Sequence, residues 1–167
     1  MPKKQVFVSK GSRPWFRFDW WDVVKITNID KSVSGQATVT CNGSVTNMNG
    51  IFSGCCNLTS IDLSGFDTSK VTEMAGMFYE CERLTELDLS NFDTSKIKDM
   101  QNMFYGCSNL TTIKGVIDMK SCTEEGYYFM FYKCPKLKNV KIKNPPIDTD
   151  WWKKAGFRFE SQFTIVS

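Results

Sequence analysis

The sequence predicts an α/β fold built from a short stack of repeats, and two observations support this prediction. The first is a phenylalanine that recurs at a nearly constant spacing, as Phe52, Phe78, Phe104 and Phe131. The second is that a cysteine and a leucine follow each phenylalanine three and six positions later. Self-similarity at a fixed period of roughly 20–29 residues is the signature of a leucine-rich-repeat solenoid.

The repeats divide the chain of 167 residues into a central stack and two flanks that together form one structural domain. The expected divisions are an N-terminal cap (1–44), four repeats (45–70, 71–96, 97–121 and 122–142) and a C-terminal cap (143–167). Because one repeat cannot bury its own apolar face, the copies must stack, with parallel strands side by side.

Each repeat contains two apolar periodicities. In the second copy, one stripe at i, i+3, i+4 and i+7 comprises Met74, Met77, Phe78 and Cys81. This spacing predicts a short helix that faces the core. Leu87 and Leu89 alternate around an outward Asp88, which predicts a strand on the other face. The connector FDTSK supplies short polar side chains that can cap free N–H groups before the next helix.

The flanks carry no copy of the repeat. Residues 36–41 (QATVTC) alternate as a strand does, residues 148–156 read as a short helix ended by Gly156, and residues 163–166 (FTIV) read as a final strand. All five tryptophans lie in the flanks: Trp15, Trp20, Trp21, Trp151 and Trp152. They either seal the apolar ends of the stack or form an aromatic binding platform.

The repeated cysteines indicate free thiols rather than a metal site. Cys55, Cys81, Cys107 and Cys134 occupy one column, so the outer two lie roughly 14 Å apart at a strand spacing of about 4.8 Å. Four thiolates on one zinc ion lie within about 4.6 Å of one another. We therefore expect a buried, reduced cysteine column, and neither a metal nor another cofactor.

An enzymatic function is not expected. The chain has no histidine, which removes the commonest general base and metal ligand near neutral pH. No constellation of carboxylates or cysteines replaces it.

The strand side chains that point away from the core form the expected partner-binding face. With the two C-terminal tryptophans, the candidate residues are Ser60, Asp62, Glu86, Asp88, Thr112, Lys114, Asn139, Lys141, Lys143, Trp151 and Trp152. One column of this face is expected to contain Asp62, Asp88, Lys114 and Lys141. The neighbouring Asp62 and Asp88 need an explanation, because like charges opposite one another destabilise a sheet. Either the repeat merely copies a tolerated surface residue, or the strip recognises a partner.

Charge changes sign along the stack. Residues 57–100 hold nine acidic and four basic residues, whereas residues 130–158 hold two acidic and eight basic ones. Such a gradient can orient a protein partner and speed its encounter. The basic end next to Trp151 and Trp152 could alternatively contact the phosphates of a nucleic acid.

The pattern MxxMFxxCxxLTxLDLSxFDTSKVT resembles the BspA-type leucine-rich repeat of bacterial surface proteins and of phage and mobile-element proteins. The resemblance covers residues 45–142. It implies a non-enzymatic adhesion or protein-binding module.

We expect a monomer that binds a protein partner and has no association with a membrane. The N-terminal residues lack the apolar block of a signal peptide, which favours a cytoplasmic protein, with a virion or cell surface as the alternative. Two function classes stay open: an adhesion protein of a cell or virion surface, and a phage-encoded intracellular inhibitor of a host defence enzyme, comparable to an anti-CRISPR protein.

Overall fold

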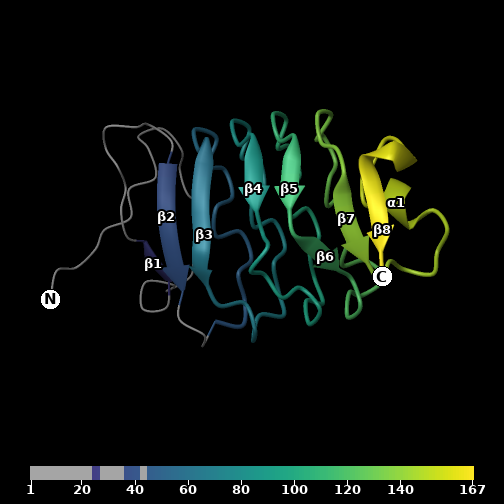
Figure 1. Cartoon of the computed structure of the whole chain (residues 1–167), viewed down its shortest axis with the longest axis horizontal. Helices are drawn as coiled ribbons and strands as arrows, with labels where there is room; N and C mark the ends of the chain where they lie inside the picture. The colour runs from purple at the N-terminus through teal and green to yellow at the C-terminus, as the bar shows by residue number, and fades with distance from the viewer. Residues whose placement is uncertain (1–23, 27–35, 42–44) are drawn as a thin grey trace, which may run out of the picture.

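The computed structural model describes residues 24–26, 36–41 and 45–167, and the tryptophans expected in the N-terminal cap lie outside them. Its strands lie side by side in chain order (Figure 1). They form three small sheets: β1 (Val24–Ile26), β2 (Gln36–Cys41) and β3 (Ser60–Phe66); β4 (Glu86–Asp88) and β5 (Thr112–Lys114); and β6 (Val116–Asp118), β7 (Val140–Lys143) and β8 (Phe163–Val166). The pair β1–β2 is antiparallel and every other pair is parallel.

The strands follow the predicted alternation of buried and exposed side chains. In β4 the side chain of Leu87 is buried while those of Glu86 and Asp88 are exposed, and β5 repeats this pattern around Ile113. The strands at residues 36–41 and 163–166 are confirmed as β2 and β8. The predicted short parallel strands are therefore confirmed, within a mixed structure that has few helices.

The prediction of a short helix in each repeat is wrong. The stripe residues are buried as expected, but the segments that carry them form consecutive turns. Gly76 and Glu80 have φ values of 60° and 55°, in the left-handed region that interrupts a right-handed helix. The i, i+3, i+4 spacing fits these turns as well as it fits a helix, which is why the sequence pattern did not separate the two.

The turn segments are tied to one another by backbone hydrogen bonds. Within the second repeat, the N–H of Tyr79 donates to the carbonyl of Gly76 at 3.0 Å, closing a turn. The N–H groups of alternate residues bond to the third repeat instead. Gly76 donates to the carbonyl of Gln101 and Phe78 to that of Met103, both at 2.8 Å. In the first three repeats, alternate backbone N–H groups of the turn segments are thus hydrogen-bonded to the following repeat.

The core contains a column of stacked phenylalanines that runs through all four repeats. Ring centroids are 5.3 Å apart for Phe52 and Phe78, 5.8 Å for Phe78 and Phe104, and 5.5 Å for Phe104 and Phe131. Phe157 from the C-terminal flank extends the column at 4.4 Å. The column joins the repeats and the flank into one apolar core.

The fourth repeat is out of step with the first three, and this corrects one expected alignment. The N–H of Lys138 donates to the carbonyl of Thr111, whereas Lys141 pairs with Val116. The two residues of the second pair are therefore closer in sequence than those of the first. The difference is absorbed between Thr111 and Val116, a stretch in which Gly115 has a φ of 96°. Lys141 therefore stands beside Val116 and not in the column of Asp88 and Lys114.

The C-terminal flank closes the stack with the helix α1 (Trp151–Lys154) and the 3-10 turn η2 (Glu160–Gln162). The N-cap of the helix is Asp150, one or two positions beyond the expected Thr149 or Asp148, and the predicted terminal glycine is confirmed by a φ of 95° at Gly156. Its last carbonyls have no partner within the helix. Those of Lys154 and Ala155 accept the N–H groups of Phe129 and Phe131 from the fourth repeat.

Candidate functional site

The strand face is the outer side of the parallel strands, and the structure places most of the predicted binding residues there. The exposed members are Asp62, Glu86, Asp88, Thr112, Lys114, Asn139 and Lys141, while Ser60 and Lys143 are half-buried. Backbone register brings Glu86 beside Thr112 and Asp88 beside Lys114. The face is therefore a strip of polar side chains contributed by successive repeats.

The two aspartates of the strip have a role in the turns that follow the strands. The carboxylates of Asp62 and Asp88 each accept the backbone N–H two positions later, from Ser64 and Ser90, at 2.9 Å. The Ser64 N–H and hydroxyl lower the pKa of Asp62; the Ser90 hydroxyl and N–H, aided by the charge of Lys114, lower the pKa of Asp88. These bonds explain the repeated aspartate, so the like-charge pair is not in itself a sign of a partner.

Glu86 and Lys114 form an ion pair across the β4–β5 junction. The Lys114 Nζ lies 3.8 Å from the Glu86 Oε2, and both side chains are more than half exposed. Exposed pairs of this kind contribute little to folding. Their charges remain accessible at the point where the strip changes from acidic to basic.

The two C-terminal tryptophans differ in accessibility. Trp151 is buried against Phe163, with ring centroids 5.1 Å apart, and against Phe157 at 6.2 Å. Trp152 is half-buried and lies under the ammonium group of Lys153 at 5.3 Å. Trp151 acts as a cap of the core, and a binding platform could use only Trp152.

A second surface, on the turn side, was missed by the sequence analysis. Tyr79 and Tyr105 stack at 4.9 Å, Tyr132 continues the row at 5.5 Å, and Lys133 lies 5.2 Å above the Tyr105 ring. Phe129 crosses the Tyr132 ring at 78° and is half exposed. The signal was present in the sequence, because a tyrosine follows the repeated phenylalanine in three copies.

The cysteine column is buried and its thiols are held protonated. Cys81, Cys107 and Cys134 each donate their S–H to the carbonyl of the phenylalanine of the preceding repeat. Burial raises the pKa of Cys134 to about 12 and raises that of Cys107 further. Within the described ranges, no group of three or more potential ligands is placed to hold a metal ion. No described helix is long and apolar enough to cross a bilayer.

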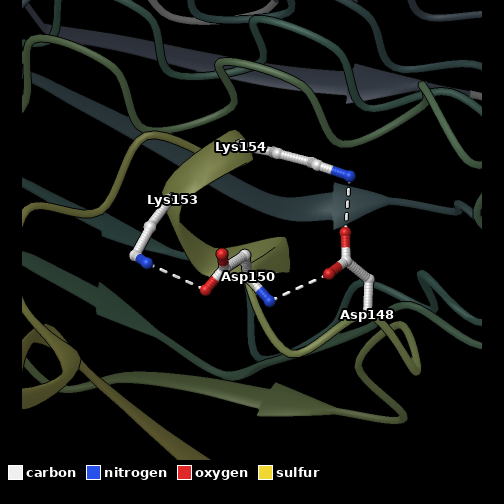
Figure 2. Close-up of polar contacts among 4 residues, drawn as sticks. All are labelled: Asp148, Asp150, Lys153 and Lys154. Carbon is white, nitrogen blue, oxygen red and sulfur yellow. Dashed lines mark hydrogen bonds and ion pairs between the residues drawn. The ribbon is translucent and has the colours of Figure 1, made fainter.

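The charges at the C-terminal end are partly neutralised around α1. Figure 2 shows Lys153 paired with Asp150 and Lys154 paired with Asp148, which also accepts the N–H of Asp150. Lys141 and Lys143 on β7 form no ion pair with any described residue. On the strand side of this end, Lys141 and Lys143 therefore contribute positive charge that no described carboxylate pairs with.

Comparison with known proteins places the chain in a family without assigning it an activity. No curated protein matches it, and no solved structure does. A family model matches residues 40–144, which include all four repeats and more than half of the chain. The chain belongs to the family described as "Mycoplasma protein of unknown function, DUF285".

Proposed function

We propose that this chain is a non-catalytic protein-binding module of the BspA type, a leucine-rich-repeat solenoid that recognises a protein partner through the strand face. The observation that carries the proposal is the register of β4 and β5, which sets exposed polar side chains of successive repeats beside one another. A regular strip of this kind offers a partner a continuous surface, which neither scattered surface residues nor the buried cap provides. The match to a family of unknown function leaves the partner to be identified.

The charge step at Glu86 and Lys114 is the centre of the proposed interface. Charges at an interface act mainly on the rate of association and on the choice of partner. Because the ion pair is exposed, exchanging its two residues reverses the local charge pattern while it keeps an ion pair within the chain. This exchange is a sharper test than reversing Glu86 and Asp88 together, since Asp88 also closes a turn.

Affinity capture from host lysate, followed by quantitative mass spectrometry, tests the proposal. We expect one protein to be captured by the wild-type chain and lost with Glu86→Lys combined with Lys114→Glu, at an unchanged melting temperature. Glu80→Lys on the turn side is the control and should retain it. Loss of the captured protein with Trp152→Ala, but not with the charge exchange, would place recognition at the C-terminal cap.

Of the two possible roles, adhesion protein and intracellular inhibitor, the buried thiols favour the inhibitor. Buried S–H groups that donate to carbonyls fit a reducing compartment, where disulfides are rare. A captured enzyme whose activity falls on addition of the purified chain would support the inhibitor. A captured surface component with no such effect would support adhesion.

A further inference from the structure

The last strand, β8, has one edge that no other described strand covers. It pairs with β7 over all four residues, Phe163 to Val166, and stands last in the order of its sheet (Figure 1). An edge strand presents N–H and C=O groups that can pair with another chain. The sequence FTIV carries neither a charge nor a proline, the two features by which proteins commonly block such pairing.

Ile165 is the uncovered end of an aliphatic column in the core. Register places it beside Ile142, which lies beside Ile117. The exposed fractions are 1% for Ile117, 0% for Ile142 and 57% for Ile165. Trp151 covers the neighbouring Phe163, so the cap seals one half of the end of the stack and leaves the Ile165 half open. One more strand would bury Ile165 as β8 buries Ile142.

Charge distinguishes between the possible occupants of this edge. On β7, Lys141 lies beside Thr164 and Lys143 beside Val166, and neither lysine has an ion pair in the described part of the chain. Residues 130–167 hold eight basic and three acidic residues, so this end carries a net positive charge, although Asp118 of β6 stands beside Lys143. Two copies of the chain meeting here would repel each other, whereas an acidic segment would be attracted.

We propose that the β8 edge binds an extended acidic segment of a partner protein, which adds to the sheet as a further parallel strand. An aliphatic side chain of that segment covers Ile165. The flanking carboxylates lie beside Thr164 and Val166, on the same face as Lys141 and Lys143, which are one strand further into the sheet. The chain contains its own template for such a strand: in β4, the inward Leu87 lies between Glu86 and Asp88, next to Lys114 on β5. Strand addition of this kind takes affinity from backbone hydrogen bonds and specificity from alternate side chains.

The test uses the full chain and a synthetic peptide with the sequence of residues 85–92, TELDLSNF. Titration is followed by NMR through the amide signals of Phe163 to Val166. We expect these signals to shift, and we expect a peptide with lysine at the positions of Glu86 and Asp88 to bind about tenfold more weakly. The difference should shrink at high salt.

Matched variants locate the site. Ile165→Asp should abolish binding of TELDLSNF. Ile147→Asp, the same chemical change at a fully exposed loop residue, should leave it intact. Equal binding of the acidic and basic peptides, no shift at β8, or no effect of Ile165→Asp would each overturn the proposal.

Two further measurements distinguish this proposal from self-association of the chain and from the strand-face proposal. A concentration-dependent dimer in sedimentation that disappears with Ile165→Asp would show that the occupant is a second copy, which overturns the acidic partner. The exchange of Glu86 and Lys114 should leave peptide binding at β8 unchanged. Failure of the edge proposal is thus distinguishable from failure of the strand-face proposal.

Discussion

The thiol of Cys107 donates a hydrogen bond of 3.1 Å to the carbonyl oxygen of Phe78, so a cysteine of the third repeat binds the backbone of the second. Cys81 and Cys134 make the equivalent contacts to Phe52 and Phe104. The protonated thiols of the cysteine column therefore help to hold neighbouring repeats together.

Stability should fall in alkaline solution because of these thiols. The pKa of Cys134 is raised by burial from 9.0 to about 12. Between these values the unfolded thiol loses its proton and the folded one keeps it, so stability decreases as pH rises. We expect Cys134 to account for a loss of about 1.4 kcal/mol in the free energy of unfolding from pH 8 to pH 10. Denaturant titrations should show a decline smaller by this amount in Cys134→Ala, and an identical decline in both proteins would contradict it.

Phe78→Ala should strongly destabilise the whole stack. Phe78 is fully buried between Phe52 and Phe104, and removing such a side chain costs about 3–5 kcal/mol. The measurement is urea unfolding followed by circular dichroism. Tyr79→Ala, the adjacent half-buried residue of the tyrosine row, is the control and should cost clearly less. Equal losses would mean that the phenylalanine column is not the main support of the core.

Thr94 should be replaceable by serine but not by valine. Its hydroxyl is buried, accepts the N–H of Asp118 at 2.7 Å and donates to the Asp118 carbonyl at 3.2 Å. Valine keeps the shape but leaves both backbone groups unsatisfied, which costs about 1–3 kcal/mol. Thermal unfolding should show a marked loss for Thr94→Val and a small one for Thr94→Ser. A stable valine variant would show that water reaches these groups.

Gly115→Ala and Gly54→Ala should differ although both glycines have positive φ. A Cβ at Gly115 would lie 2.8 Å from the backbone of Leu89, whereas one at Gly54 would meet nothing within 4 Å. The left-handed conformation alone costs roughly 1–2 kcal/mol, and we expect Gly54→Ala to lose about that much. Gly115→Ala should lose more, because the β4–β5 backbone must also move. Melting temperatures of the two variants, compared with the wild type, measure the difference.

The strands and the core were predictable from the sequence because burial imposes a strict period. The alternation of Leu87, Asp88 and Leu89 predicted an extended segment, and β4 covers its first two residues; the column of Phe52, Phe78 and Phe104 follows from the constant step. The turn segments were not predictable in this way. Their conformation depends on hydrogen bonds from Gly76 and Phe78 to a different repeat. The spacing of apolar residues within one repeat carries no information about bonds between repeats.

The position of the candidate site could be predicted from the sequence, but the roles of its individual residues could be predicted only in part. Glu86, Asp88 and Lys114 lie on the outer face in the expected register. The turn bond of Asp88 and the burial of Trp151 assign structural roles to two residues that had been expected to contact a partner. The shift that moves Lys141 beside Val116 falls between Thr111 and Val116, and the change in repeat length did not show its effect on the alignment of Lys141.

The bonds between turn segments also have an electrostatic consequence. The peptide group that joins Met77 to Phe78 accepts from Phe52 and donates to Met103, and the next one donates in turn to Met130. Peptide dipoles are therefore linked head to tail along the repeat axis, as they are along an α-helix, and each bond polarises the next. Their positive ends face the C-terminal flank, where Phe131 donates to Ala155. The backbone itself thus adds a positive potential to the end of the molecule that already carries the unpaired lysines.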